Sequence, residues 1–450
     1  MTGTPEQAAY ETKKQRLAAV LHNGVESSIR LEKNTSNLFR SRRPRDACGL
    51  DVRDFNRVIR VCPEERFVET EGMTTYRDLT RECLRYEVMP TVVPQLQSIT
   101  AGGAVSGIGI ESSSFQYGLV HETVREMEIL LADGSSVVCT PENGHSRLFF
   151  GFPNSYGTLG YVLKLRIGVV PVKPHVRLTH IRHRDALSFF TEMERLCQSD
   201  IDFLDGTVFG PDELYLTVGE FTDSAPYCSD YTFRNIYYRS IRERPTDYLP
   251  VKDYIWRWDT DWFWCSQYVY AENPVVRSLL GPKRLNSVTY AKIMRWNRKH
   301  DLAGFLDRLR GYSGEAVIQD VEIPLEQCAA FLEFYFNTIK FTPVWVCPVK
   351  PLQKKTVFSL YPLDPETLYV NFGFWNVIRT RTKKEPGHYN RLVEKKVRQL
   401  GGMKSLYSDS YYSREEFWDI FNRKEYRYLK NRYDPDKRFK DLYEKCVERG

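Results

Sequence analysis

Residues 99–118 are the stretch whose composition points most directly to chemistry, because glycines alternate there with Ser and Thr behind Pro90 and Pro94. Glycine has no Cβ and tolerates positive φ, so consecutive backbone N–H groups can converge on an anion while hydroxyls add further donors. The pattern therefore indicates a phosphate-binding loop. Taken alone, the same run also fits a glycine-rich turn between two strands.

The segments that follow favour the phosphate-binding interpretation. Residues 127–138 read as an apolar strand, a turn at Asp133 and Gly134, and a second strand. Residues 154–162 then form a second loop with glycines and hydroxyls, which leads into an alternating strand over 162–167. Two loops of phosphate-binding size thus flank one hairpin.

In this order and spacing the segment resembles the FAD-binding domain of the vanillyl-alcohol oxidase and p-cresol methylhydroxylase (PCMH) family. The 24-dehydrocholesterol reductase branch is the most similar, because matching stretches follow one another from about residue 30 to the carboxyl terminus. They are residues 109–114, 131–134, 139–141, 157–160, 253–254, 317–320, 343–348, 368–371 and 407–418.

The resemblance implies an α+β fold, with a two-subdomain PCMH-type FAD-binding domain and a sheet-based substrate cap. We expect an amino-terminal helix in residues 1–28, the FAD-binding domain in 29–175, the cap in 176–400, and a segment over 401–450 that returns to the FAD-binding domain. Hydrophobic periodicity predicts helices over 6–23, 74–86 (capped by Thr74), 186–197 and 325–339. It predicts strands over 59–61, 66–70, 176–180, 214–218 and 368–372.

The family's loops cradle an extended FAD, and the matching positions here are the expected contacts. The pyrophosphate is assigned to Pro94, Thr100, Gly102, Gly103, Ala104, Ser106 and Gly107, and the contact is extended by Ser113, Ser114, Gly118 and Thr123. The other side of the FAD site is assigned to Gly157, Thr158, Gly160 and Val162.

The first loop departs from the family's usual glycine triplet followed by His-Ser. In its place, Thr35, Ser36, Asn37 and Arg40 offer hydroxyls, an amide and a guanidinium to phosphate oxygens. No histidine lies in residues 23–120, and no cysteine stands just before Gly102. Both usual sites of covalent attachment are therefore missing, and we expect FAD to be bound non-covalently.

Catalysis would need a proton donor beside the flavin. In the reduction of a carbon–carbon double bond, flavin N5 delivers hydride to one carbon and an acidic side chain protonates the other. The candidates are Tyr407, Asp409, Tyr411 and Asn371, with Glu111 and Asp320 as further carboxylates. The alternative for each tyrosine is a half-buried aromatic whose hydroxyl is already satisfied.

The resemblance implies reduction of a C=C bond in a hydrophobic lipid, either a methylene-branched fatty acyl chain or a sterol-like molecule. NADPH is the expected electron donor, although the chain has no strand–GxGxxG–helix unit of its own. One alternative is an FAD-dependent alcohol or sugar oxidase or dehydrogenase on the same fold. Another is a flavin protein without turnover that partners a lipid-modifying methyltransferase.

Composition narrows the class of protein. A chain of 450 residues with 42% apolar residues builds two globular parts. Its net charge of +6 suits anionic cofactors or an anionic membrane surface, but no dense basic stripe points to nucleic acid. The ten cysteines form no CxxC pair or metal-ligand spacing, so we expect reduced thiols and no metal. No window reaches the ~20 apolar residues of a membrane span, and no signal peptide is seen, so we expect a cytoplasmic protein, with peripheral membrane contact left open.

Residues 254–264 contain four tryptophans and are followed by Tyr268 and Tyr270. Tryptophan and tyrosine suit a boundary between apolar tails and water, so this segment either docks on a membrane or lines the mouth of a lipid tunnel. A cap-domain core or a homodimer surface explains the same composition equally well.

Overall fold

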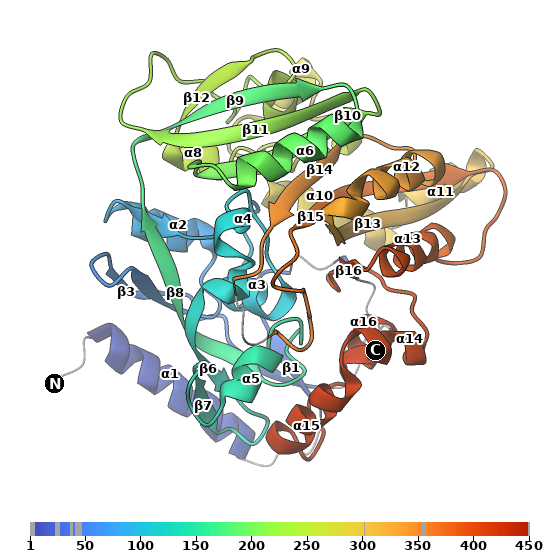
Figure 1. The fold of residues 1–450 in the computed structure, drawn as a ribbon. Helices are drawn as coiled ribbons and strands as arrows, with labels where there is room; N and C mark the ends of the chain where they lie inside the picture. Colours follow the sequence, from blue (N-terminus) through green and yellow to red (C-terminus); the bar gives the residue numbers. More distant parts are fainter. Residues whose placement is uncertain are drawn as a thin grey trace.

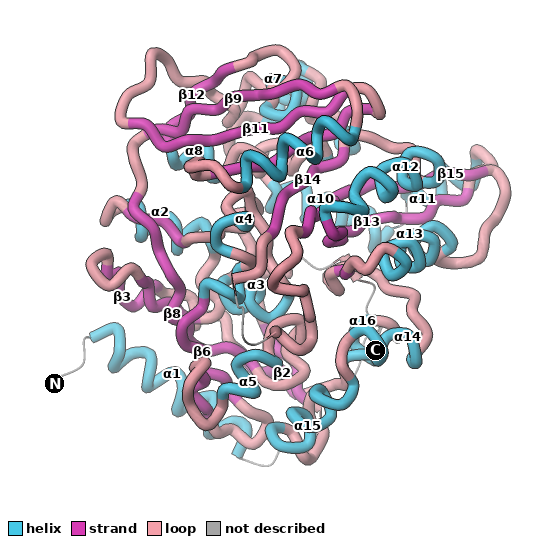
Figure 2. Tube along the Cα trace, in the orientation of Figure 1, coloured by secondary structure: helices cyan, strands magenta, loops and turns pink. Residues whose placement is uncertain are grey.

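The structure is a computed structural model that describes residues 5–22, 28–36, 39–40, 47–300, 302–352 and 357–448. Two sheet-containing parts are stacked one above the other, with the carboxyl-terminal helices beside the lower one (Figure 1). The strands form an upper and a lower group, and the short helices α3 (Ala101–Gly107) and α4 (Ser114–Tyr117) lie between them (Figure 2). The mixed architecture confirms the predicted α+β class.

The lower part contains a two-stranded parallel sheet and a six-stranded sheet. In the larger sheet the order is β3-β4-β8-β6-β7, and β5 also pairs with β8. The strands are β1 (Ile29–Glu32), β2 (Cys48–Asp51), β3 (Val58–Cys62), β4 (Phe67–Glu71), β5 (Val88–Pro90), β6 (Val124–Leu130), β7 (Ser136–Cys139) and β8 (Tyr161–Pro171). Its other helices are α1 (Pro5–His22), α2 (Tyr76–Leu84), η1 (Val120–Thr123) and α5 (Ser146–Gly151).

The upper part is built on one antiparallel sheet of eight strands in the order β12-β9-β11-β10-β14-β15-β13-β16. The strands are β9 (His175–His183), β10 (Phe203–Gly210), β11 (Glu213–Thr222), β12 (Thr246–Pro250), β13 (Ser313–Pro324), β14 (Val344–Val349), β15 (Tyr369–Thr380) and β16 (Met403–Lys404). The helices are α6 (Ala186–Cys197), α7 (Tyr237–Ser240), α8 (Val251–Ile255), η2 (Cys265–Val269), α9 (Pro274–Leu280), α10 (Ser287–His300), α11 (Leu302–Leu309), η3 (Leu325–Gln327), α12 (Cys328–Thr338) and α13 (His388–Gln399).

Strand alternation gives this upper sheet two different faces. Val344 and Val346 join a core with residues of α6, α12 and α13, whereas Trp345 and Cys347 belong to the core shared with the lower part. Successive side chains of a strand point to opposite faces, so the side chains of the odd-numbered residues of β14 point toward the lower part. The same alternation determines which side chains of β13 and β15 reach the site.

The carboxyl-terminal segment returns to the lower part, but later than expected. β16 still pairs with β13 in the upper sheet, so cap structure continues past residue 400. The helices α14 (Arg414–Ile420), α15 (Arg423–Tyr433) and α16 (Leu442–Cys446) follow. Lys430 Nζ in α15 donates to the Thr158 carbonyl at 2.8 Å, which fastens this segment to the lower part.

Most predicted elements are confirmed, and two details differ. The glycine-rich run is a helix over part of its length, because the Thr100 hydroxyl accepts from the Gly103 N–H at 3.2 Å and caps α3. Helix α2 is capped by Thr75 instead of Thr74, since the Thr75 side chain accepts from the Asp78 N–H.

The tryptophan-rich segment is buried. Trp258, Trp262 and Trp264 are 1%, 6% and 1% exposed, so docking on a membrane through these tryptophans is wrong. They pack in the core that joins the two parts. Large aromatic rings bury extensive apolar area, which explains their density here.

Candidate active site

Two adjoining cavities are present: the smaller lies between the upper and lower parts, and the larger lies within the lower part and the carboxyl-terminal segment. One has a volume of about 220 Å³ and the other of about 500 Å³. Both are lined by Lys33, Thr100, Gly103, Ser106 and Tyr156, so they form one elongated space. Together they fall within the roughly 300–1,000 Å³ of small-molecule sites, and their shape suits an extended ligand.

Glycines allow α3 to pack closely against β8 at the floor of this space. A Cβ on Gly102 would lie 2.9 Å from the Gly72 carbonyl oxygen and 3.3 Å from Val162 Cβ. A Cβ on Gly72 would lie 2.1 Å from the Val162 carbonyl oxygen. A side chain at Gly102 would push α3 away from Gly72 and β8, and one at Gly72 would clash with the backbone of β8, so close backbone approach requires glycine at both positions.

Most residues predicted to hold FAD line the two cavities. The cavity of about 220 Å³ is lined by Thr35, Ser36, Pro94, Thr100, Gly103, Ala104, Ser106 and Gly107. The cavity of about 500 Å³ adds Arg40, Gly102, Gly157, Gly160 and Val162. Asn37 lies outside the described residues. The two predicted loops therefore meet at one site, as their spacing on either side of the hairpin indicated.

Five predicted cofactor residues line neither cavity: Ser113, Ser114, Gly118, Thr123 and Thr158. The hydroxyls of the four Ser and Thr residues among them bind protein atoms, and the Ser113 hydroxyl, for example, donates to the Thr91 carbonyl at 2.7 Å. The Thr158 hydroxyl donates to the Ser155 carbonyl at 2.8 Å. These residues shape the loops, and the structure does not place them against a ligand.

Several buried polar atoms at the cavities have no partner among the residues that the structure describes. At the smaller cavity, the atoms without a hydrogen-bond partner are Gln95 Oε1, Gln95 Nε2 and the Ser405 hydroxyl. At the larger cavity, Arg40 Nε has no such partner. An unsatisfied buried donor or acceptor costs about 1–3 kcal/mol, so these atoms call for a polar ligand. A flavin ring edge and a pyrophosphate offer donors and acceptors of this kind, and the residues present therefore fit FAD.

A row of three residues across the upper sheet forms the roof of the smaller cavity. Trp345 in β14 and Asp320 in β13 both lie opposite Gly373 in β15. A Cβ on Gly373 would come within 2.7 Å of both Asp320 Oδ1 and the Trp375 ring. Because Gly373 has no side chain, there is space for the Asp320 carboxyl and for the indoles of Trp345 and Trp375 to line the cavity.

The remaining walls of the smaller cavity are aromatic. Trp262, Phe263 and Trp375 line it together with Phe39. The rings of Phe263 and Trp375 have centroids 4.5 Å apart, and those of Phe39 and Trp262 are 5.7 Å apart. Such walls favour an apolar ligand over a polyol, because a sugar would leave hydroxyls without partners.

One carboxyl with an altered pKa faces this aromatic space. Asn371 Nδ2 donates to Asp320 Oδ1 at 3.2 Å, and Trp375 Nε1 donates to the Tyr407 hydroxyl at 2.7 Å. Burial raises the pKa of Asp320 to about 7, and the hydrogen bonds from Asn371 and Tyr407 oppose that rise. Burial also holds the pKa of Tyr407 well above its ordinary value. A carboxyl that keeps its proton near neutral pH is able to act as a general acid.

The structure brings only part of the predicted catalytic set together. Tyr407 lines the cavity and Asn371 contacts Asp320, which lines it as well. Asp409 and Tyr411 line neither cavity. The Asp409 carbonyl accepts from Lys404 Nζ at 2.9 Å, and the Tyr411 N–H donates to Glu394 Oε1 at 3.1 Å.

Sequence reasoning did not assign Trp345, Trp375 or Gly373 to the site, and it offered Trp262 and Phe263 only as part of a segment that could line the mouth of a lipid tunnel. The alternation of β14 and β15 was the available signal, since it places Trp345, Asn371, Gly373 and Trp375 on the face opposite the valines and phenylalanines.

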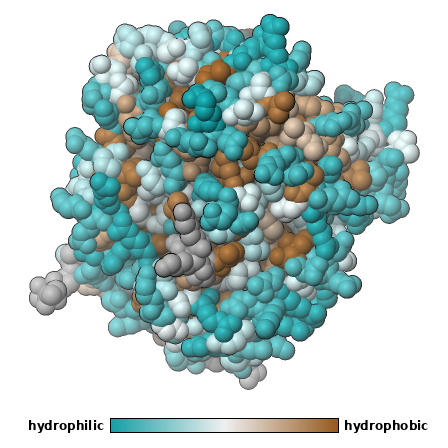
Figure 3. Space-filling view, in the orientation of Figure 1, coloured by the Kyte–Doolittle hydropathy of each residue, from teal (hydrophilic) through white to brown (hydrophobic). Residues whose placement is uncertain are grey.

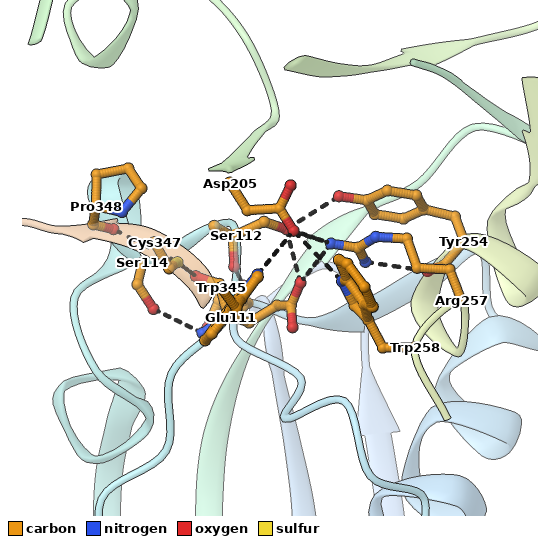
Figure 4. Close-up of polar contacts among 12 residues, drawn as sticks. Glu111, Ser112, Ser114, Asp205, Tyr254, Arg257, Trp258, Trp345, Cys347 and Pro348 are labelled. Carbon is orange, nitrogen blue, oxygen red and sulfur yellow. Dashed lines mark hydrogen bonds and ion pairs between the residues drawn. The ribbon is translucent and has the colours of Figure 1, made fainter. Parts of the chain in front are cut away.

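A buried ionic cluster beside Trp345 joins the upper and lower parts of the molecule. Arg257 Nη2 lies 3.0 Å from Glu111 Oε1 and 2.9 Å from Asp205 Oδ2, and all three side chains are at most 5% exposed (Figure 4). Glu111 comes from the loop after α3, and Asp205 comes from β10. Glu111 is therefore a structural partner at the junction and not a cavity residue.

The same cluster fixes the cavity wall. Trp345 Nε1 donates to Asp205 Oδ2 at 3.1 Å, and Trp258 Nε1 donates to the same oxygen at 3.4 Å (Figure 4). The Arg257 guanidinium stacks over the Tyr254 ring at 4.1 Å from its centroid. Arg257 thus acts on the site through Asp205 and Trp345, as a positioning residue.

In the described part of the chain, no helix has the length and hydropathy needed to cross a membrane. No group of three or more His, Cys, Asp or Glu side chains is arranged there to hold a metal ion.

Known proteins resemble both the FAD-binding part and the whole chain. Residues 17–140 match the family model of an FAD binding domain. The Delta(24)-sterol reductase of Homo sapiens is 30% identical over 410 residues, which is 87% of this chain and 76% of that protein. The Delta(24)-sterol reductase of Arabidopsis thaliana is 24% identical over 88% of this chain and 76% of its own length. Cytokinin dehydrogenase 7 of Oryza sativa subsp. japonica is 27% identical, but over only 36% of this chain and 31% of its own length. The chain belongs to the Delta(24)-sterol reductase family, whose members it matches through both the cofactor site and the cap.

Proposed function

We propose that this protein is an FAD-dependent reductase of a C=C bond in a hydrophobic lipid, with electrons supplied by NADPH. The observation that carries the proposal is a carboxyl with a pKa of about 7, Asp320, in an aromatic cavity that continues into the predicted FAD site. The family relationship supports the reaction class, since the relatives are named as reductases of a Δ24 sterol.

FAD is held mainly by the glycines and hydroxyls of α3 and of the loop before β8, with Arg40 beside them. No histidine or cysteine is among the described residues that line the two cavities, which supports non-covalent binding. Denaturation should then release the yellow colour into a filtrate.

FAD held by these residues would supply the hydride for one carbon of the double bond. Asp320 gives its proton to the other carbon and later regains one from solvent, so the product gains two hydrogens and NADPH becomes NADP⁺. Asn371 and Tyr407 orient the carboxyl, and Trp375 holds the Tyr407 hydroxyl. The aromatic walls exclude water from the carboxyl and the substrate.

The substrate class follows from the same walls. Trp262, Phe263, Trp345 and Trp375 present flat apolar surface and few hydrogen-bonding groups. A sterol-like ring system or a methylene-branched fatty acyl chain fits such walls, and burial of apolar area provides the binding energy. An alcohol or sugar oxidase would need more polar groups around its substrate hydroxyl.

Turnover with defined lipids tests this function. The holoenzyme is incubated with NADPH in D₂O and either a Δ24 sterol or a phospholipid with a methylene-branched acyl chain, and the lipid is analysed by mass spectrometry. We expect one of the lipids to be saturated, with one deuterium on the carbon that Asp320 protonates. Oxidation of an alcohol or a polyol, with no lipid reduced, would instead identify the oxidase alternative.

A further inference from the structure

An apolar surface on the cap is exposed although the tryptophan-rich segment is not. On α10, Ile293, Met294 and Trp296 are 37%, 37% and 54% exposed. On α11, Phe305, Leu306 and Leu309 are 52%, 50% and 69% exposed. The two helices contact each other, and we call these six residues, with Lys292 and Arg295 between them, the α10–α11 surface. Neighbouring exposed apolar residues of this size mark an interaction site.

The segment that contains the α10–α11 surface is strongly basic in sequence. Residues 283–310 contain eight Lys or Arg and two Asp, a net charge of +6, which equals the net charge of all 450 residues. The rest of the chain therefore sums to zero. Lys292 and Arg295 are exposed beside Trp296, and Asp307 pairs with Arg379 at 2.9 Å. An anionic partner is the complement of such a surface.

The α10–α11 surface is connected to the cavity wall. The Tyr290 hydroxyl of α10 donates to the Thr260 carbonyl at 2.9 Å, and the Ser287 hydroxyl donates to Asp259 Oδ1 at 2.5 Å. These bonds anchor α10 to the segment that provides Trp262 and Phe263 to the cavity. Helix α10, which carries part of the surface, is thus joined directly to the segment that lines the cavity.

The α10–α11 surface does not lie on the face shown in Figure 3. In the orientation of Figure 1, α10 and α11 are drawn faintly behind the strands of the cap. The face turned to the viewer is mainly hydrophilic around its edge, with hydrophobic residues interspersed (Figure 3). The two helices are therefore on the side away from the face in Figure 3.

We propose that the α10–α11 surface docks the protein on an anionic lipid bilayer. Trp, Phe and Leu side chains enter the headgroup boundary, and flanking Lys and Arg bind anionic headgroups. Choosing a bilayer over a protein partner rests on the lipid substrate of the proposed function together with the charge of residues 283–310. The docking itself requires no turnover, so it is measured independently of that function.

Vesicle pelleting of the full holoenzyme tests the docking. The vesicles are phosphatidylcholine alone, or equal parts of phosphatidylcholine and phosphatidylserine. We expect binding to the anionic vesicles only, and loss of binding when the salt is raised from about 0.1 M to about 1 M, because the Debye length falls from about 10 Å to about 3 Å.

Two variants separate the apolar and the charged contributions. Trp296→Ser with Leu309→Ser, and Lys292→Glu with Arg295→Glu, should each lower the partition coefficient by more than about tenfold. The matched controls are Leu187→Ser with Val138→Ser, which are exposed elsewhere, and Arg182→Glu with Arg184→Glu, which are exposed near the end of β9. Both controls should bind like the unchanged protein, and the flavin content per chain checks that every variant is folded.

Three results would overturn the docking proposal. They are no binding to anionic vesicles, equal binding to both vesicle types, and equal loss in the controls and the surface variants. The unchanged protein could instead be a dimer by light scattering, become a monomer in Trp296→Ser with Leu309→Ser, and bind no vesicles. That result would assign the surface to a second copy of this chain. A protein that reduces lipid in detergent but does not bind vesicles would overturn the docking and leave the proposed function standing.

Discussion

Asn371 Nδ2 donates to Asp320 Oδ1 at 3.2 Å across two neighbouring strands. The pairing is diagonal, because Asp320 lies opposite Gly373 and Asn371 lies opposite Glu322. Since Gly373 has no side chain, the amide reaches past it to the carboxyl. This contact holds a carboxyl with a pKa of about 7 at the roof of the cavity.

Replacing Asp320 by Asn removes the proton donor while keeping the shape of the side chain. We expect kcat for lipid reduction to fall by about 10²–10⁴, the usual contribution of a general acid. In the unchanged protein, kcat should decline as the pH rises above about 7, since burial raises the pKa of Asp320 to about 7 and the donor then loses its proton. A pH–rate profile of both proteins checks this, and an unchanged alkaline limb in Asp320→Asn would assign the limb to another group.

Glu322→Gln is the matched control, because this carboxyl lies two residues away on the same strand and bonds the Tyr361 hydroxyl instead of lining the cavity. Its kcat should stay close to that of the unchanged protein. Burial raises the pKa of Glu322 to about 8, so the folded state binds more protons than the unfolded state between about pH 4.5 and 8. The stability that Glu322 contributes is present at low pH and is lost as the pH rises.

Relative to Glu322→Gln, the unchanged protein should therefore lose up to about 1.4 kcal/mol of unfolding free energy per pH unit in this window. Denaturant unfolding of both proteins at pH 5 and pH 8 measures this difference. If the unfolding free energy of the unchanged protein rises relative to that of Glu322→Gln between pH 5 and pH 8, the pKa of Glu322 is not raised by burial.

Gly373→Ala should reduce activity while the protein still folds. The new Cβ would lie 2.7 Å from Asp320 Oδ1 and from the Trp375 ring, so the carboxyl must move from its place beside Asn371. We expect kcat to fall by about 10²-fold, since small misplacements of reacting groups are this costly. Gly210→Ala in β10 is the control, because its nearest neighbour would be 3.6 Å away, and its kinetics should be normal.

Arg257→Met should destabilise the protein by about 3–5 kcal/mol, because Glu111 and Asp205 are left buried without their cation. Adding Asp205→Asn should restore part of the loss, since one of the two uncompensated charges disappears. Arg242→Met breaks a half-exposed pair with Glu213 and should cost at most about 1 kcal/mol. Equal losses for Arg257→Met and Arg242→Met in denaturant unfolding would contradict the role of the cluster.

The sequence was sufficient to predict the FAD-binding part, because local rules define it. The turn at Asp133 and Gly134 and the two glycine-rich loops are short-range patterns, and they correspond to the β6–β7 hairpin, α3 and the loop before β8. Ser113 and Ser114 resemble Ser106 by type, yet only Ser106 lines the cavity. Their difference arises from where the chain turns after α3, which residue types do not encode.

The upper wall of the site depends on pairings between distant strands. Asp320, Trp345 and Gly373 meet only because β13, β15 and β14 are neighbours in the sheet. Tyr407 and Asp409 were equal candidates by sequence, but the end of β16 sends only Tyr407 to the cavity. For the tryptophans of 254–264, composition fitted a membrane, a lipid tunnel and a core alike. Packing places Trp258, Trp262 and Trp264 in the core between the two parts, and Trp262 also lines the cavity.

Anaerobic mixing of the yellow holoenzyme with NADPH, followed by the candidate lipid, tests the central claim most directly. We expect NADPH to bleach the flavin absorbance at about 450 nm, a property of the cofactor, and an unsaturated lipid to restore it in the absence of oxygen. A flavin that NADPH leaves oxidised, but that an alcohol or a sugar bleaches, would contradict the assignment as a C=C reductase.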